Sequence, residues 1–268
     1  FLTDRTTPEE IYKAHDSKII FGVKLYPAGA TTNSDTGVTD LNKLNKTFAA
    51  MQEVGMVLQI HGEVTDKNID IFDREAVFIE TILKPLVEKF PTLKVSLEHI
   101  TTEESVTFVT KDSDSVHASI TPQHLLYNRN DMLVSGIRPH LFCLPILKRE
   151  RHQQALLEAA TSGNKKLYLG TDSAPHARDQ KENCCGCAGC YSHLSAIELY
   201  AEVFDQFNAL DKLEGFASMH GPDFYGLPYN DSFISLKRQK WKIPSSIKYL
   251  NTELIPLGAN SELNWKLI

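Results

Sequence analysis

Short, unbroken apolar runs alternate with amphipathic stretches along this chain, and no other feature constrains its fold as strongly. The runs lie at residues 19–25, 56–60, 93–97, 116–120 and 166–169, with a sixth strand expected as a stub at Phe1. Continuous apolar character, rather than alternation, is typical of strands buried on both faces. Apolar residues at helical spacing and a capping pattern predict helices over 41–54, 73–90, 101–109, 153–161 and 195–210. This order predicts a parallel sheet covered by helices.

Charge and length narrow the class of protein further. The chain has 268 residues, and its 28 Lys and Arg against 34 Asp and Glu give a net charge of −6. Without a clustered positive surface, neither a nucleic acid nor an anionic membrane is an expected partner. No apolar stretch approaches the roughly 20 residues that cross a bilayer. No linker divides the sequence, so we expect one domain over 1–268.

The cysteines indicate a reducing compartment. One of the five stands alone at Cys143, and the other four lie between Cys184 and Cys190. An odd, bunched set is a poor disulfide framework, so a cytoplasmic location is expected. The two overlapping Cys-x-x-Cys spacings would suit a zinc knuckle or a redox pair. Because no second ligand pair lies at the usual distance, a tight glycine-rich loop is the favoured alternative.

Polar residues suited to catalysis stand where four of the predicted strands end. They are Lys24, His61, His99 and Asp172. The carboxyl ends of parallel strands converge on one mouth in a barrel, so these side chains are expected to meet. A buried lysine must lose its charge or gain a partner, neutral imidazoles bind zinc, and an aspartate can bind metal or act as a general base. Each residue also has a structural interpretation, such as a hydrogen-bonded histidine or a helix cap. Their recurrence at one strand end after another favours a metal site.

Seven motifs give the chain a specific resemblance. They are Lys24-Leu25-Tyr26-Pro27-Ala28-Gly29-Ala30-Thr31-Thr32-Asn33-Ser34, His61-Gly62-Glu63, Phe72-Asp73-Arg74-Glu75, Glu98-His99-Ile100-Thr101-Thr102, Thr121-Pro122-Gln123-His124, Arg138-Pro139-His140 and Gly170-Thr171-Asp172-Ser173-Ala174-Pro175-His176. Together they resemble the short, single-function dihydroorotases of the amidohydrolase superfamily, from the first residues to about residue 230. Other zinc hydrolases of that superfamily share only the order Lys, His, His, Asp.

The resemblance implies a fold, a metal centre and a reaction. The fold would be a (β/α)8 TIM-type barrel, and the reaction the reversible, zinc-dependent cyclisation of N-carbamoyl-L-aspartate to L-dihydroorotate in pyrimidine biosynthesis. Carried over by position, Lys24 would be N6-carboxylated and bridge two zinc ions in each subunit. His61 and His99 would bind the second ion, while Asp172 would bind the first and transfer the proton. Members of this family are commonly homodimers.

The same resemblance implies contacts with the small-molecule substrate. His176 would contact its carboxylate, and main-chain groups of Leu144 and Ala188 would hold the ring amides. Thr31 and Thr32 would form the tip of a loop that closes over the substrate and hydrogen-bonds to it. The cysteine-rich loop around Ala188 would then have a role that needs no metal, since small residues let the main chain approach a ligand.

One part of the family pattern is missing. The first strand of such a barrel should end in a His-x-His pair, and this sequence contains none. We therefore expect the chain to begin near the end of the third barrel strand, with the remaining ligands upstream, and to be inactive by itself. Two alternatives stay open: a hydantoinase-like hydrolase of another cyclic amide, and a non-catalytic homologue that acts as a structural partner.

Overall fold

Five parallel strands form the centre of the structure, which is a computed structural model that describes residues 1–30 and 34–268. The strands pair in chain order, β1-β2-β3-β4-β5. Their bounds are β1 Gly22–Leu25, β2 Val57–His61, β3 Val95–Glu98, β4 Val116–Ile120 and β5 Leu167–Leu169. The predicted parallel sheet is therefore confirmed, and consecutive parallel strands joined through helices are the arrangement of a TIM-type barrel.

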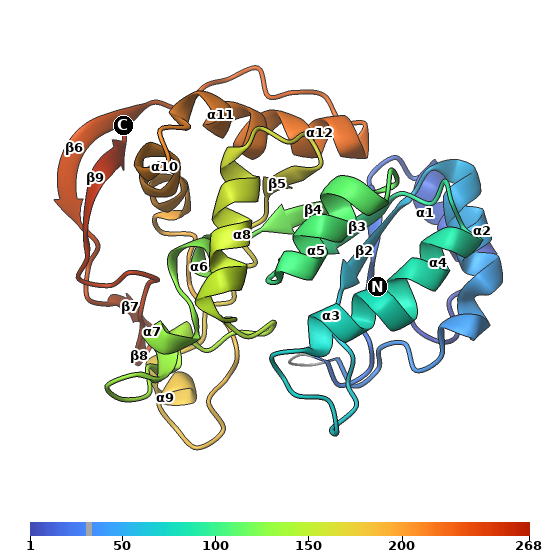
Figure 1. Ribbon diagram of the computed structural model, residues 1–268, viewed down its shortest axis with the longest axis horizontal. Coiled ribbons are helices and arrows are strands. Elements are labelled where there is room, and N and C mark those ends of the chain that lie inside the picture. Colours follow the sequence, from blue (N-terminus) through green and yellow to red (C-terminus); the bar gives the residue numbers. More distant parts are fainter. Residues whose placement is uncertain (31–33) are drawn as a thin grey trace.

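Helices connect the strands and cover one face of the sheet, as α2, α4, α5 and α8 show (Figure 1). The helices up to β5 are α1 Pro8–Asp16, α2 Asn45–Val54, α3 Arg74–Phe78, α4 Lys84–Lys89, α5 Glu103–Thr107, α6 Pro122–Leu126, α7 Arg129–Leu133 and α8 Glu150–Thr161. After β5 come α9 Arg178–Lys181, α10 Ala196–Gln206, α11 Leu210–Glu214 and α12 His220–Tyr225. The loops after β2 and β5 lie along the lower side of Figure 1.

The core lies between the sheet and these helices. Strand residues such as Leu58, Ile60 and Leu97 are at most 1% exposed, and Phe48 of α2 and Phe78 of α3 are buried with them. Each such side chain contributes about 1.5–3 kcal/mol on burial. This packing fixes the positions of the strand ends, where the predicted site residues stand.

Several predicted elements differ from the structure. The strand expected over 19–25 begins only at Gly22, the first residue to pair with β2, and Ile19 and Ile20 are 75% and 43% exposed. The helix expected over 73–90 is interrupted by a π-helical turn, Ile79–Leu83, just before Pro85. Proline has no N–H and its ring crowds the carbonyl four residues back, which disrupts the regular helical ladder there.

The stub expected at Phe1 is not a strand in the structure. The Leu2 N–H donates to the Lys24 carbonyl at 2.7 Å, so only one backbone contact extends β1 on that side. Among the described residues, β1 and β5 are the two outer strands of the parallel sheet, and each pairs with a strand of this sheet on one side only.

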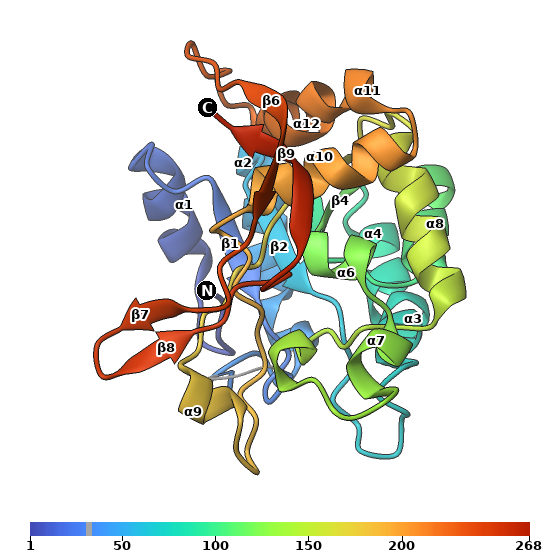
Figure 2. The same ribbon diagram turned by 90° about the vertical axis from the view of Figure 1, so that its left-hand side faces the viewer.

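The C-terminal segment forms two antiparallel pairs that the sequence did not predict. They are β6 Leu236–Lys242 with β9 Glu262–Leu267, and β7 Ile247–Tyr249 with β8 Thr252–Leu254. Figure 2 shows β6 and β9 beside α10, where Glu202 accepts hydrogen bonds from the Asn264 and Trp265 N–H groups.

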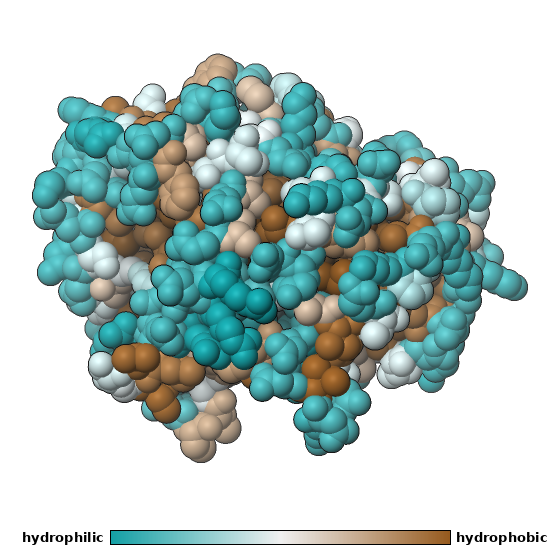
Figure 3. Space-filling view, in the orientation of Figure 1, coloured by the Kyte–Doolittle hydropathy of each residue, from teal (hydrophilic) through white to brown (hydrophobic). Residues whose placement is uncertain are grey.

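The surface is largely hydrophilic on the face shown in Figure 3, with apolar side chains gathered near α7. Leu133, Val134 and Ile137, at the end of α7 and just after it, are 49%, 56% and 78% exposed. None of the helices in the described residues has the length and apolar character needed to span a membrane.

Candidate active site

The sheet places the four predicted ligands near the carboxyl ends of its strands. Lys24 lies within β1, His61 is the last residue of β2, and His99 directly follows β3. In the sheet register His61 is opposite Glu98, and Lys24 is opposite Gln59. Asp172 follows β5 by three residues and begins no helix, so the cap interpretation of Gly170-Thr171-Asp172 does not hold.

Lys24 has gained a partner, which is one of the two outcomes expected for a lysine in this position. Its ammonium forms an ion pair with Glu98, the residue that precedes His99. The Nζ atom also lies 5.3 Å from the centroid of the Tyr26 ring. Both neighbours are stabilising for a cation that is only partly exposed. In the structure, therefore, the lysine charge is balanced by Glu98.

The two histidines are buried and close to each other. Their rings lie 4.8 Å apart, centroid to centroid, in an edge-on arrangement. His61 Nε2 lies 2.9 Å from a carboxylate oxygen of Glu63. Because a carboxylate only accepts hydrogen bonds, Nε2 is the donor, and in the neutral imidazole Nδ1 then keeps its lone pair. His99 Nδ1 is buried without a hydrogen-bond partner, so each imidazole has a nitrogen free to bind a cation.

The charges around these residues affect one another. Burial lowers the pKa of His99 well below its usual range, and the nearby Lys24 ammonium lowers it further. Asp172 has exposed surface, but the surrounding protein partly desolvates its carboxyl and raises its pKa to about 6. Lys24 and His61 act in the opposite direction, and Glu98 raises the pKa of Asp172 further. Asp172 is thus an electrostatic neighbour of the other predicted ligands.

His99 and Asp172 share an unusual backbone conformation. Their φ angles are 46° and 42°, in the left-handed region that non-glycine residues seldom adopt. At His99 the N–H donates to Ser119 Oγ at 2.9 Å. Close to Asp172, a side chain at Gly170 would put its Cβ 2.5 Å from Ser119 Cβ. Ser119 of β4 therefore contacts both the backbone at His99 and the backbone at Gly170, close to Asp172.

The chemistry of these donors fits zinc, which prefers imidazole nitrogen and carboxylate oxygen. The unpartnered His99 Nδ1 and the free Nδ1 of His61 are the observations behind this fit. As placed in the part of the chain that the structure describes, however, no three His, Cys, Asp or Glu side chains are close enough to share one ion. The predicted second zinc site has only two ligands of these types, His61 and His99, and its third ligand is Lys24.

The predicted substrate-binding residues lie around the cysteine-rich loop. His176 Nε2 donates to the Ala188 carbonyl at 3.1 Å. The Gly189 N–H donates to the Phe142 carbonyl at 2.9 Å, which connects this loop to the segment that contains Leu144. Thr31 and Thr32 lie outside the described residues. The structure thus brings His176 and Ala188 together and places the Leu144 segment next to them.

A buried lysine that sequence reasoning missed organises this loop. Lys181 is 2% exposed, and its ammonium donates to the carbonyls of Phe142, Cys187 and Gly189 at 2.8, 2.7 and 2.7 Å. Burial lowers its pKa. All five cysteines are free thiols. The Lys181 ammonium therefore fixes the main chain of the cysteine-rich loop.

Comparison with known proteins identifies the class. The sequence pattern of the amidohydrolase family matches residues 2–232, so the chain belongs to the amidohydrolase family. A dihydroorotase of Acaryochloris marina is 62% identical over 268 residues, which are all of this chain and 78% of that protein. A dihydroorotase of Shewanella oneidensis is 61% identical over 267 residues, again all of this chain and 78% of the relative. Within its family the chain belongs with the dihydroorotases.

Solved structures agree with this assignment. The dihydroorotase of Saccharomyces cerevisiae, crystallised with 5-fluoroorotic acid, is 36% identical and superposes with a TM-score of 0.91 over all of this chain and 78% of that one. A D-hydantoinase of Bacillus sp. AR9 has a TM-score of 0.79 but is only 15% identical, over 97% of this chain and 64% of that one. The hydantoinase shares the fold alone and gives the hydantoinase alternative no support beyond it.

Proposed function

We propose that the protein to which this chain belongs catalyses the reversible closure of N-carbamoyl-L-aspartate to L-dihydroorotate with loss of water, the cyclisation step of pyrimidine biosynthesis. Relatives about 60% identical over the whole chain are dihydroorotases. The geometric observation that carries the proposal is the placement of two buried, mutually close histidines beside Lys24 at one edge of a parallel sheet. Sites at the carboxyl ends of such strands are where barrel enzymes carry out their chemistry.

Lys24, in its N6-carboxylated form, and His61, His99 and Asp172 would be ligands of two zinc ions. Bound zinc supplies an activated water and polarises the carbonyl under attack. Carboxylation would turn the Lys24 cation into an anionic oxygen donor, and its ion pair with Glu98 would break. Asp172 would take the proton released in hydrolysis and deliver it to the leaving ring nitrogen, and in cyclisation it would move the proton in the opposite direction.

The substrate would lie between this edge and the cysteine-rich loop. His176 would turn from the Ala188 carbonyl to the substrate carboxylate, which frees that carbonyl for a ring N–H. Main-chain groups of Leu144 and Ala188 would hold the ring amides, and the hydroxyls of Thr31 and Thr32 would hydrogen-bond to the substrate. The Lys181 ammonium keeps the loop main chain in place for these contacts.

A cytoplasmic homodimer is the expected form of the protein. Five free thiols suit a reducing compartment. Light scattering of the purified protein measures the oligomeric state directly, and a monomer at working concentration would contradict this part of the proposal.

The decisive experiment compares two aspartates in the full-length protein. Asp172→Asn should lower kcat for dihydroorotate hydrolysis by about 100- to 10,000-fold, since the proton carrier is lost. Asp231→Asn, at an exposed position, is the matched control and should leave the rate unchanged. Wild-type turnover by Asp172→Asn, or faster turnover of hydantoin than of dihydroorotate, would refute the proposed function.

Metal analysis tests the cofactor assignment separately. Two zinc ions per subunit are expected, together with extra electron density on the Lys24 amine in a crystal of the active enzyme. An active protein without zinc, or with an unmodified Lys24, would contradict the assigned metal centre.

A further inference from the structure

Three charged side chains lie buried next to the two histidines and take no part in the proposed chemistry. Glu63 and Glu75 are each 2% exposed, and Lys148 is 3% exposed. Charged residues at this depth are rare unless they are paired, because their desolvation is costly. We call these three residues the buried charge cluster.

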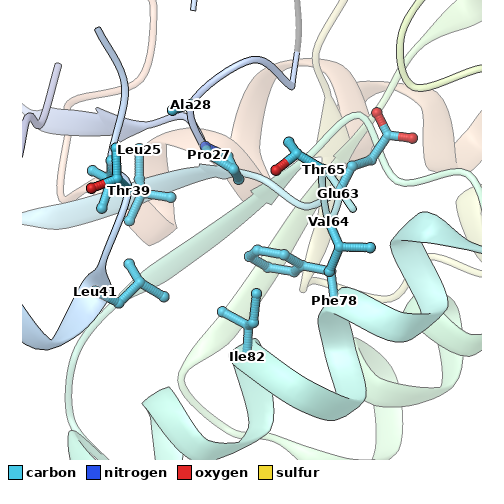
Figure 4. A pocket seen from close by; sticks show the side chains of 11 residues that line it. Leu25, Pro27, Ala28, Thr39, Leu41, Glu63, Val64, Thr65, Phe78 and Ile82 are labelled. Atoms are coloured by element: carbon cyan, nitrogen blue, oxygen red, sulfur yellow. The ribbon is translucent and has the colours of Figure 1, made fainter. Parts of the chain in front are cut away.

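Glu63 is the member in direct contact with the site. One carboxylate oxygen accepts the hydrogen bond from His61 Nε2, and the other has no hydrogen-bond partner. Figure 4 shows Glu63 at the rim of a cavity of about 300 Å³, with its carboxylate turned away from Phe78 and Ile82. The unpartnered oxygen lies 3.9 Å from Lys148 Nζ.

Glu75 holds the segment that follows His99. Its carboxylate accepts hydrogen bonds from the N–H and hydroxyl groups of both Thr101 and Thr102, and from the Ser105 hydroxyl. Together with the Lys148 charge, these donors keep the pKa of Glu75 below its usual value even though burial opposes them. The carboxylate therefore remains charged.

The cluster carries more negative than positive charge. Two carboxylates face one ammonium, and Lys148 donates a hydrogen bond to the neutral Ile146 carbonyl. Nearby His124 does not restore the balance, because burial lowers its pKa to about 4 and leaves it neutral. An excess buried anion is unfavourable unless a cation lies close to it.

We propose that Glu63 is a positioning residue for a metal ion at His61: it holds the imidazole as the Nε2-protonated tautomer and, with Glu75 and Lys148, supplies a buried negative charge that the bound dication balances. A carboxylate on the far nitrogen of a metal-bound histidine fixes the ring and makes it a stronger ligand. This inference rests on the proposed function, since it assumes that His61 binds metal.

Two substitutions in the full-length protein separate the hydrogen bond from the charge. Glu63→Gln keeps an oxygen that accepts from His61 but removes the charge, whereas Glu63→Met removes both. Glu80→Gln removes an exposed carboxylate from the turn between α3 and α4 and is the matched control. Zinc affinity is measured by competition with a chelator, and nitrogen NMR of the metal-free protein reports the His61 tautomer.

Glu63→Gln should retain the tautomer and bind zinc about 10- to 100-fold more weakly. Glu63→Met should lose the tautomer preference as well, and Glu80→Gln should stay close to wild type. Circular dichroism identifies a variant that fails to fold, and if Glu63→Met fails, Glu63→Gln decides. If the wild-type enzyme binds zinc and turns over its substrate, two results would overturn the inference. One is a zinc affinity of Glu63→Gln equal to that of the wild type, and the other is an equal loss of affinity in Glu80→Gln. A wild-type protein that binds no zinc would instead overturn the proposed metal centre itself.

Discussion

Replacing Glu75 with glutamine is expected to destabilise the fold more than any exposed charge substitution in this chain. The Glu75 carboxylate receives hydrogen bonds at 2.7–3.0 Å from the N–H and hydroxyl groups of Thr101 and Thr102, and a further one from Ser105. All three donor residues are at most 1% exposed, so water cannot replace the lost acceptor. An amide keeps one acceptor oxygen and puts an NH₂ group where the other oxygen was.

The magnitude follows from charge and burial. Hydrogen bonds to a charged group contribute about 1.5–3 kcal/mol each, against about 1 kcal/mol for neutral pairs. The contributions are not additive, because the donors belong to one network. The neutral amide also leaves Lys148 with a weaker counter-charge, and breaking a buried pair costs about 3–5 kcal/mol. We expect Glu75→Gln to lower the free energy of unfolding by about 3–5 kcal/mol.

Urea unfolding followed by circular dichroism measures this loss. Glu80→Gln, five residues further along on the exposed side of the same helical segment, should change the unfolding free energy by less than about 0.5 kcal/mol. If Glu75→Gln loses less than about 1 kcal/mol, the carboxylate is not the anchor of the segment after His99, and the reasoning fails.

Three further predictions concern other parts of the structure. Lys181→Met should raise KM for dihydroorotate about tenfold with a smaller change in kcat, because the loop that binds the ring loosens, whereas exposed Lys165→Met should change neither. Burial lowers the pKa of half-buried His117 to about 4, below the value of 6.5 expected in the unfolded chain. Between pH 6.5 and about 4 the unfolded chain therefore binds more protons than the folded protein, and the free energy of unfolding falls as the pH drops. With allowance for its partial exposure, His117→Phe should reduce that fall by about 1–2 kcal/mol in urea titrations at each pH, and an unchanged slope would contradict the assignment. Gly170→Ala should cost about 1–3 kcal/mol because its Cβ would overlap Ser119, and Ser119→Gly should recover part of the loss.

Strands buried on both faces could be predicted from the sequence, because continuous apolar runs have few other uses. β4 matches its predicted bounds, and the other four differ mainly at their ends. The prediction over 19–25 was too long because an apolar run does not reveal where pairing begins. The strand β6 was missed because Leu236–Lys242 is mostly charged and exposed, so its stability comes from pairing with β9 and from Glu202.

The site residues divide in the same way. Lys24, His61, His99 and Asp172 could be proposed because each stands at a strand end, which local sequence pattern reveals. Lys148 and Lys181 could not, since Lys148 lies beside Glu63 and Lys181 donates to the Phe142 carbonyl, and only the folded chain brings these distant residues together. Glu63 was within reach of the sequence: a carboxylate two residues after a candidate ligand histidine is a signal worth testing.

Glu75, together with Ser119, also holds the strained backbone at His99. Left-handed conformations at non-glycine residues such as His99 and Asp172 cost about 1–3 kcal/mol each and persist only where the surroundings impose them. Around His99, Ser119 Oγ holds the N–H of the residue itself, the Ser119 carbonyl holds that of Ile100, and Glu75 holds that of Thr101. These successive contacts leave the backbone no local alternative, so the His99 ring is directed toward His61 before any ligand arrives. Loss of the Glu75 contacts should therefore weaken metal binding at His99 as well as the fold, and the zinc affinity of Glu75→Gln should fall even where most of the protein is still folded.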